Sequence, residues 1–389
     1  MPSPMNLSKA ADQCVMCGMC LPHCPTYQVS LHEAESPRGR ISLVKALAEG
    51  KLDPSASLAT HLQSCTGCMQ CQQICPANVP YQYIIDQGRQ LYRRKLTPLR
   101  RWSQLLYISV LTHTLGHRLI SLTKFFIKLL PINKQSTRIL RHLSSEVKTI
   151  GIKHAPETVT IFPGCTGPLL DQPTMNSIVR ILNALNVKAR LPDKILCCGA
   201  LAQHSGHQLI AEKRLGEINK FLSEPDSAEF ISFATGCGRH LNENISKSQT
   251  AHKDIIDWLS SHEAFTTTVF KPFKQRVLVH MPCTMQNSTR VHVMKLLSAI
   301  PEIQLLTFED NLSCCGAGGM QIMSPEQSNR ALLEAKIDRV RMLQPDLIVS
   351  ANIGCALNLK LGLDSANLDI AVVHPVTLLA RQLLHSSTA

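Results

Sequence analysis

Two pairs of neighbouring cysteines, each followed by a glycine, are residues whose types and spacing point to chemistry. They are Cys197-Cys198-Gly199 and Cys314-Cys315-Gly316. Consecutive Cα atoms lie about 3.8 Å apart, below the roughly 4.4–6.8 Å that a relaxed disulfide spans. A disulfide within either pair is therefore disfavoured, and two such pairs are a poor match to ordinary buried cysteines. We expect each pair to work with thiols from elsewhere in the chain.

Eight further cysteines form two runs near the N-terminus, each with the spacing C-x2-C-x2-C-x3-C-P. This spacing is typical of [4Fe–4S] proteins in which the fourth cysteine of each run ligates the other cluster. Zinc is the alternative, but zinc sites normally take four ligands in paired spacings. The proline after each fourth cysteine suits the first turn of a helix. The pattern assigns Cys14, Cys17, Cys20 and Cys75 to cluster 1, and Cys65, Cys68, Cys71 and Cys24 to cluster 2.

The segment between the two runs, ESPRGRISLVKALAEGKL, predicts a helix. Ser36-Pro37 marks its start, and apolar residues recur at helical spacing from Ile41 to Leu47. We expect this helix to pack over the clusters. Arg38 and Arg40 are expected on its solvated surface, with a partner-facing role as the alternative.

Residues 155–389 contain an internal repeat. TVTIFPGCTGP aligns with RVLVHMPCTMQ, the two cysteine pairs align with each other, and FISFATGCGRH aligns with LIVSANIGCAL, at offsets of 118, 117 and 118 residues. Each half reads as strand, helix, strand, helix, strand, which predicts a parallel sheet. The cysteines follow strand ends, where open α/β sheets place their ligand sites.

The repeat supplies the partner thiols that the two cysteine pairs need. Together with the eight cysteines of the N-terminal runs, these thiols account for all 16 cysteines of the chain. Each half thus predicts one metal or thiol site: Cys165, Cys197, Cys198 and Cys237 in the first half, and Cys283, Cys314, Cys315 and Cys355 in the second.

The expected fold is α+β and multidomain. We predict a helical two-cluster ferredoxin-type domain over residues 1–98, a basic amphipathic helical linker over 99–154, and two cysteine-rich α/β domains over 155–270 and 271–389. The N-terminus shows no secretory signal, which favours a cytoplasmic protein in a reducing compartment. No run of about 18 uncharged apolar residues predicts a membrane-spanning helix.

The net charge of +12 is concentrated in residues 87–145, which carry 12 Lys or Arg and no Asp or Glu. Such a local excess argues against nucleic-acid binding by the whole chain and for a docking surface. An apolar stripe from Leu105 to Leu129 runs beside these charges. Three interpretations stay open: a helix packed on the protein's own core, a surface for another subunit, or peripheral contact with the anionic inner face of a membrane.

At these residues the chain resembles the iron–sulfur subunit of glycolate oxidase. The runs themselves, CPTYQ after the first run and SPRGRISLVKALAEG carry the resemblance, which covers essentially the whole chain. It implies two [4Fe–4S] clusters, an FAD-containing partner chain that oxidises the substrate, and a quinone-type electron acceptor. The iron–sulfur subunit of anaerobic glycerol-3-phosphate dehydrogenase has the same architecture and is the alternative. Cysteine-rich domains of this type, called CCG domains, also occur in heterodisulfide reductase and in lactate-utilisation proteins.

The chain departs from heterodisulfide reductase at the last cysteine of each half. In that family the motif ends in C-x-x-C and five thiolates hold one cluster, whereas His240 and Asn358 stand at the corresponding positions here. The two sites are therefore open to a cubane cluster, zinc, no metal, or a thiol function such as disulfide reduction. His240 is a candidate substitute ligand, and His280 and His374, at expected strand ends, are interpreted as structural. The sequence shows no G-x-G-x-x-G after a strand and no P-loop, so no catalytic residue is assigned.

Overall fold

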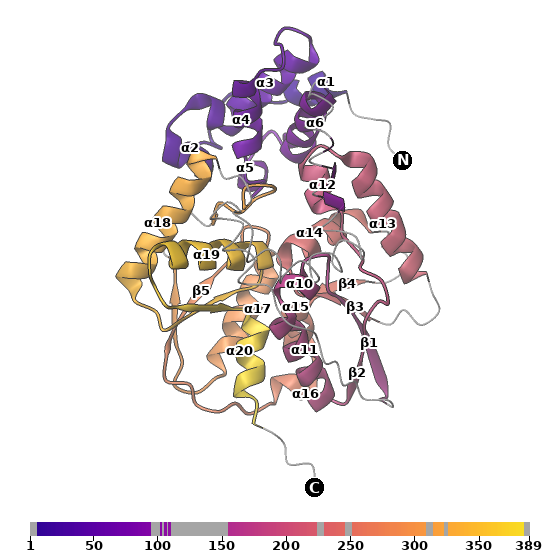
Figure 1. The fold of residues 1–389 in the computed structure, drawn as a ribbon, viewed down its shortest axis with the longest axis vertical. Helices are drawn as coiled ribbons and strands as arrows, with labels where there is room; N and C mark the ends of the chain where they lie inside the picture. Colours follow the sequence, from indigo (N-terminus) through magenta and orange to yellow (C-terminus); the bar gives the residue numbers. More distant parts are fainter. Residues whose placement is uncertain are drawn as a thin grey trace, which may run out of the picture. The chain divides into compact units, whose positions relative to one another are not determined.

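The computed structural model describes residues 6–94, 102, 105, 106, 108, 109, 155–223, 229–245, 251–308, 314–322 and 326–384. The chain divides into two compact units. The first comprises Met1–Ile108, Ala200–Ala211 and Glu309–Asp338, and the second comprises Ser109–Gly199, Glu212–Phe308 and Arg339–Ala389. The expected fold class is confirmed, because a helical N-terminal part precedes two α/β regions with parallel sheets (Figure 1). The four domain limits stay a prediction.

The first unit is built mainly from short helices around a small apolar core. Leu62, Ile84 and Ile85 are almost completely buried in this core. The described helices that lie wholly in this unit are α1 (Leu7–Asp12), α2 (Pro25–Ser30), α3 (Pro37–Ala48), α4 (Ala56–Ser64), α5 (Gln70–Gln73), α6 (Tyr81–Arg94) and α12 (Ala200–His204), with the 3-10 turn η1 (Glu33–Glu35).

Helix α3 forms where the sequence predicts it. The Ser36 side chain accepts a hydrogen bond from the Gly39 N–H, and Pro37 is the first helical residue, so both start signals act as expected. Ile41 and Val44 are buried in the core of the first unit. The apolar stripe therefore faces inward, as its spacing indicates.

The second unit contains two four-stranded sheets with the same topology. The strand orders are β2-β1-β3-β4 and β6-β5-β7-β8, and every pair of neighbours is parallel. The strands are β1 (Glu157–Phe162), β2 (Val187–Arg190), β3 (Glu229–Ser232), β4 (His252–Asp254), β5 (Arg276–His280), β6 (Gln304–Thr307), β7 (Leu347–Ser350) and β8 (Ala371–Val373). The identical orders agree with the internal repeat. In each sheet the order switches at the central pair, where α/β sheets bind ligands beyond the strand ends.

One apolar core extends across both halves of the repeat. It includes Ile161 of β1, Val279 of β5 and Val349 of β7. The helices of this unit are α10 (Gly167–Leu170), α11 (Gln172–Ala184), α14 (Thr235–Asn244), α15 (Ile255–Ser261), α16 (Glu263–Thr266), α17 (Asn287–Ser298), α19 (Ile353–Ser365) and α20 (Pro375–Gln382). Helices α13 (Gln208–Leu222) and α18 (Gln327–Leu343) contain residues of both units.

The two halves meet at the starts of α14 and α19. The Thr235 backbone N–H donates to the Ala351 carbonyl at 3.0 Å, and the Thr235 and Thr284 hydroxyls are 2.8 Å apart. Asn352, the N-cap residue of α19, also donates to the Thr284 hydroxyl. These bonds hold together the two helices that carry the last cysteine of each half.

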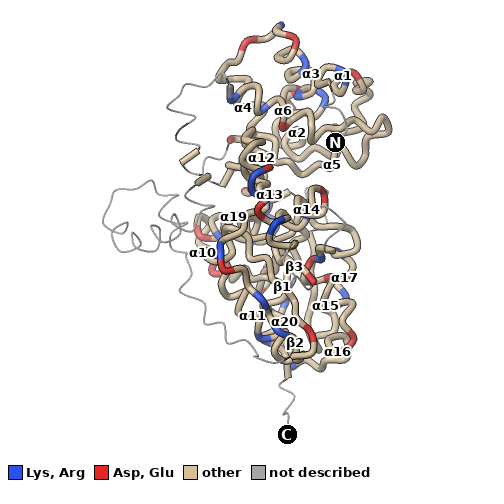
Figure 2. Tube along the Cα trace, turned by 90° about the vertical axis from the view of Figure 1, so that its right-hand side faces the viewer, with Lys and Arg blue, Asp and Glu red and all other residues tan. Residues whose placement is uncertain are grey.

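Most of the basic segment lies outside the described residues. At two described positions of its apolar stripe, Leu105 is half-buried and Ile108 is buried against Ala202 and Ala211. Elsewhere the described trace carries Lys and Arg mixed with Asp and Glu (Figure 2). Among the described helices, none is both long enough and apolar enough to cross a lipid bilayer.

Candidate iron–sulfur and thiol sites

The cysteines assigned to cluster 1 line one pocket of the first unit. Cys14, Cys17, Cys20 and Cys75 all line it, together with Cys71 of the other set. Met16 and Gly18 have left-handed backbone conformations, with φ of 59° and 82°, and these curl the loop tightly between its thiols. Cys17 is exposed and the other three are part-buried. A cluster held here would lie close to solvent.

The cysteines assigned to cluster 2 line a second pocket of the same unit. Cys24, Cys65, Cys68 and Cys71 contribute to its wall. The second loop repeats the backbone of the first, because Gly67 and Met69 have φ of 67° and 59°. All four cysteines are buried. The residues that share each pocket are thus those that crossed ligation requires, and the ligand assignment remains a proposal.

Burial sets the acidity of the cluster 2 thiols. It raises the pKa of Cys24 and raises that of Cys71 well above its ordinary value, and the neighbouring thiols add to the effect at Cys71. Two oxygens lie near the sulfurs: Thr26 Oγ1 is 3.3 Å from Cys24 Sγ, and the Tyr81 hydroxyl is 3.5 Å from Cys65 Sγ. These thiols hold their protons until a metal displaces them, so loading the site releases protons.

Arg40 is buried beside cluster 2, which corrects the expectation that it lies on the solvated surface. Its side chain is 1% exposed, and Nη1 donates to Thr26 Oγ1 at 3.0 Å. Nη2 pairs with Glu35 at 2.5 Å, and Nε donates to the His61 carbonyl. Burial alone lowers the pKa of Arg40, but Tyr81 and the cysteines Cys65 and Cys24 raise it above its ordinary value. The guanidinium therefore stays charged.

The sequence contained a sign of this burial. Arg40 stands four residues before Val44 on α3, and residues at this spacing share a helix face. Arg38 is part-exposed, with 28% of its side chain accessible: it pairs with Glu33 at 2.7 Å and donates to the Met16 carbonyl in the cluster 1 loop.

The backbone conformation after the fourth cysteine differs between the two runs. Cys24 is the N-cap residue of α2, and Pro25 is its first residue, which confirms the predicted helix start. Cys75 and Pro76 lead into a turn instead, and the next helix, α6, begins at Tyr81. The expectation of a helix after the second run is therefore wrong.

The loop around the second cysteine pair packs on the cluster 2 loop within the first unit. Gln321 donates to the Gln63 carbonyl at 2.7 Å. A Cβ atom added to Gly318 would lie 2.0 Å from the Thr66 carbonyl oxygen, so the two backbones are in contact there. Cys314 lies close enough to Cys68 to raise its pKa further, after burial, which is the larger cause.

The segment after the first cysteine pair packs on α6 in the same unit. Arg89 donates to the Cys65 and His204 carbonyls at 2.6 and 3.0 Å, and it thereby joins the cluster 2 loop to α12. Asp86 accepts a hydrogen bond from Gln203 and contacts His204 Nδ1 at 3.2 Å. Arg93 donates to the Gly206 carbonyl. Arg89 and Arg93 belong to the basic segment by sequence, but the structure uses them inside the first unit.

The structure brings together all four cysteines of the first repeat half. Cys197 hydrogen-bonds Cys165 and Cys198, and Cys198 also bonds Cys237. The bonds from Cys165 and Cys198, with the Gly199 N–H at 3.4 Å, hold the pKa of Cys197 well below its ordinary value. The pKa values of Cys165 and Cys198 are raised well above theirs, chiefly by their bonds to Cys197. Four adjoining sulfurs, one of them favoured as thiolate, form a donor set suited to a thiophilic metal.

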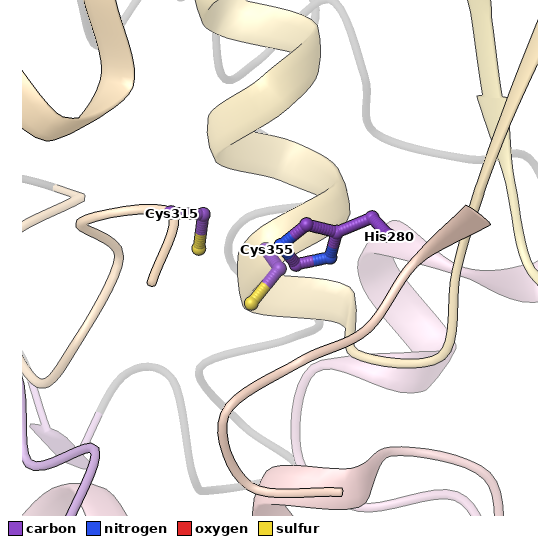
Figure 3. A group of neighbouring side chains, drawn as sticks. All are labelled: His280, Cys315 and Cys355. Atoms are coloured by element: carbon purple, nitrogen blue, oxygen red, sulfur yellow. The ribbon is translucent and has the colours of Figure 1, made fainter. Parts of the chain in front are cut away.

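The second half repeats the local backbone of the first. The Gly316 N–H donates to Cys314 Sγ at 3.4 Å, as Gly199 does to Cys197, and the two glycines have φ of 81° and 86°. In the second unit, Cys355 in the first turn of α19 lies beside His280, the last residue of β5, with a ring nitrogen within 4.8 Å of the sulfur (Figure 3). Figure 3 also labels Cys315, which the repeat aligns with Cys198.

The three histidines considered from the sequence have different surroundings. His374 is structural, as interpreted: its Nε2 bonds the Phe233 carbonyl, and its Nδ1 caps α20. His240 is 2% exposed on α14 and contacts Asn244, so it is a core residue. His280 lies next to Cys355. The sequence predicted its place at a strand end near the cysteine loops, but its interpretation was structural. The available sign was the repeat alignment, which sets His280 against an apolar residue, Phe162.

Comparison with known proteins bears on the whole chain. The 4Fe-4S dicluster domain family matches residues 10–79, and the Cysteine-rich domain family matches residues 159–242 and again 277–360. The probable glycolate oxidase iron–sulfur subunit of Bacillus subtilis is 26% identical over 96% of this chain and 94% of its own length. The chain therefore carries a 4Fe-4S dicluster domain and two cysteine-rich domains, and it is similar over almost its whole length to glycolate oxidase iron–sulfur subunits. It is therefore an iron–sulfur protein, and the resemblance stated from its cysteine runs is confirmed.

Two other relatives are also similar to most of the chain. The glycolate oxidase iron–sulfur subunit of Escherichia coli is 26% identical over 89% of each chain. One of the subunits of the CoM/CoB fumarate reductase of Methanothermobacter marburgensis is 22% identical over 97% of this chain and 73% of its own. These relatives are subunits of oxidoreductases, and the present chain is an iron–sulfur electron-transfer subunit of that kind. The two [4Fe–4S] clusters expected from the sequence agree with the dicluster domain.

Proposed function

We propose that this chain carries electrons in a flavin-dependent 2-hydroxyacid dehydrogenase that is most like glycolate oxidase. An FAD-containing partner oxidises the substrate, and a quinone-type acceptor takes the electrons. The observation that carries the proposal is the pair of cysteine-lined pockets in the first unit, each with one complete set of four expected ligands, one beside solvent and one buried. Bound clusters would supply one-electron chemistry there, while the protein positions them and sets the polarity around them.

The surface around the cluster 1 loop supports electron exchange with a partner at this site. Val15, Met16 and Met19 are 70%, 48% and 52% exposed, and exposed Cys17 lies among them. Exposed apolar side chains gathered in one loop are typical of protein contact surfaces. We expect the flavoprotein to cover this loop and reach cluster 1 directly.

The surroundings of cluster 2 support a path in which electrons pass from cluster 1 to cluster 2 and onward. The buried second pocket adjoins the loop of Cys314, because Gly318 and Gln321 hold that loop against residues 63–66. Electrons that enter at cluster 1 would thus reach cluster 2 and then a cysteine-rich half, before they leave for the acceptor.

Substrate-driven reduction tests the proposal. The complex is purified anaerobically with its flavoprotein, and the clusters are followed by EPR after addition of glycolate, lactate or glycerol 3-phosphate. We expect about eight Fe in the first domain, given two four-iron clusters, and reduction by a 2-hydroxyacid. Reduction by glycerol 3-phosphate alone would assign the chain to the alternative family member, and reduction by none of the three would refute the proposal.

A matched pair of surface variants tests the entry site. Met19→Glu places a charge beside the cluster 1 loop, whereas Val269→Glu places one at a comparably exposed position of the second unit. We expect Met19→Glu to slow reduction by the flavoprotein but not by dithionite, and Val269→Glu to slow neither. Equal effects of the two variants would exclude the loop as the entry surface.

Thiol–disulfide chemistry in the first repeat half is the second candidate function. The depressed pKa of Cys197 favours it, because thiolates are the attacking species in such exchange. The isolated chain with loaded clusters would then reduce disulfides with reduced viologen as electron source. Absence of turnover would remove this candidate and leave electron transfer as the role of the chain.

A further inference from the structure

We propose that His280 is a metal ligand in the second cysteine-rich half, which makes that site a mixed thiolate–imidazole centre while the first half is an all-thiolate centre. The proposal concerns the ligands alone and does not depend on which substrate the complex oxidises.

The position of His280 is that of a ligand. It ends β5, three residues before Cys283, and a ring nitrogen lies within 4.8 Å of Cys355 Sγ. Two ligands of one metal ion are separated by a distance of this order, because each metal–ligand bond measures roughly 2.0–2.3 Å. The side chain is 2% exposed, so solvent does not compete for the site. The repeat register aligns Cys355 with Cys237, which bonds Cys198 within the four-thiol group of the first half.

Neighbouring residues fix the imidazole in place. Nδ1 lies 3.0 Å from the Ser350 hydroxyl at the end of β7, and the ring meets Phe308 edge-on with centroids 6.0 Å apart. Metal-bound histidines usually bond a second group through the nitrogen that does not coordinate, which sets the tautomer and the ring orientation. A proton on Nδ1, shared with Ser350, makes Nε2 the coordinating atom.

The other half of the repeat provides an internal comparison. Phe162 takes the place of His280, and it packs edge-on against Phe230 at 5.6 Å in the core. Ser232 takes the place of Ser350 and bonds His252 instead, at 2.9 Å. In the first half, β1 thus ends without a histidine, and four adjoining cysteine sulfurs are the available ligands. Both halves lack the fifth cysteine of related motifs, because His240 and Asn358 stand at that position, and His280 offers the second half a further donor from another direction.

An imidazole ligand changes the electronics of the site. A neutral nitrogen donor in place of a thiolate reduces the negative charge on the centre, and such replacement raises the reduction potential of iron–sulfur centres. The second half would then hold electrons more firmly than the all-thiolate first half. That ordering would make the second half the low-energy end of the path through this chain.

The experiment uses the full-length protein, purified anaerobically, and four variants. Iron and zinc are counted per chain in wild type, His280→Phe, His280→Cys, Cys355→Ser and His240→Asn. His280→Phe installs the residue of the first half, and His240→Asn is the matched control that installs the residue of the second half. We expect His280→Phe to lose as much metal as Cys355→Ser, His280→Cys to retain it, and His240→Asn to equal wild type.

The direct test of coordination depends on which metal, iron or zinc, the variants lose. For iron, protein labelled with [15N]histidine is studied by pulsed EPR; for zinc, X-ray absorption at the zinc edge reports the donor atoms. A nitrogen donor present in wild type and in His240→Asn, but absent in His280→Cys, establishes the ligand. The proposal is overturned if Cys355→Ser loses no metal, if wild type shows no nitrogen donor, or if that donor persists in His280→Cys. Comparison with His280→Cys separates ligand loss from misfolding of the phenylalanine variant.

Discussion

Replacement of Arg40 by glutamine is expected to lower the reduction potential of cluster 2. The guanidinium is buried and stays charged, and Thr26 links it to the sulfur of Cys24. A reduced cluster carries one more negative charge than an oxidised cluster, so a nearby cation stabilises the reduced form. Glutamine retains hydrogen-bonding capacity but removes the charge, and the reduced form loses that stabilisation.

The structure fixes the scale of this effect. Arg40 Nη1 lies 3.0 Å from Thr26 Oγ1, and that oxygen lies 3.3 Å from Cys24 Sγ, so charge and sulfur are at most about 6.3 Å apart. Unit charges at this distance interact by about 2.6 kcal/mol at an effective dielectric constant near 20, which corresponds to roughly 110 mV for one electron. Glu35 pairs with Arg40 at 2.5 Å and offsets part of this attraction. We therefore expect a decrease on the order of 50 mV.

A redox titration followed by EPR measures the two cluster potentials. Arg40→Lys retains the charge and should shift cluster 2 less than Arg40→Gln does. Lys45→Gln removes an equal charge from an exposed position of the same helix, and salt and water screen that charge. Each variant must contain as much iron as wild type. Equal potentials in Arg40→Gln and Lys45→Gln would refute the reasoning.

Three further predictions concern stability and attachment. Gly318→Ala should destabilise the protein by roughly 1–3 kcal/mol, because its Cβ would lie 2.0 Å from the Thr66 carbonyl oxygen, and an unchanged thermal unfolding temperature would contradict that contact. Burial raises the pKa of Asp254 to about 7, so the folded protein retains a proton that the unfolded chain releases near pH 4, and stability falls as the pH rises between these values. Asp254→Asn should abolish this dependence of the unfolding free energy on pH, which denaturation curves at pH 5.5 and 8 measure. Three pKa units represent roughly 4 kcal/mol, and solvent screening of the part-exposed residue makes the expected effect smaller than that. Arg100→Glu with Arg101→Glu should weaken sedimentation with anionic vesicles or with the flavoprotein, most visibly at low salt, and binding equal to wild type would leave the basic segment without a docking role.

The sequence was sufficient to predict the parts of the fold that depend on local spacing. Cysteines separated by two intervening residues, one of them a glycine or methionine in a left-handed conformation, make tight loops, and the spacing alone indicates this. The duplication likewise predicts two equivalent parallel sheets, because segments that align residue by residue adopt the same topology. Ser36 and Pro37 start their helix by interactions within one turn. In each case the determining contacts join residues close in the chain or related by the repeat.

Burial of charge could not be predicted in the same way. Arg38 and Arg40 are two positions apart and chemically identical, yet the side chain of Arg38 is 28% exposed and that of Arg40 is 1% exposed. The difference comes from partners far along the chain, since the Arg40 guanidinium is satisfied by the His61 carbonyl and Ser64 as well as by nearby Glu35. A cation is buried only where such acceptors converge, and a pattern of apolar residues does not reveal acceptors.

The two halves of the repeat differ in what the segments after their cysteine pairs contact. The segments that follow the two cysteine pairs are equivalent by alignment, and both pack within the first unit, but against different elements. Residues after Cys198 meet α6 through Arg89 and Asp86, whereas residues after Cys315 meet the cluster 2 loop through Gly318. Each contact depends on residues that the other half lacks. Duplication therefore determines the scaffold of both halves, while the residues that have diverged on that scaffold determine which elements of the first unit each of these two segments contacts.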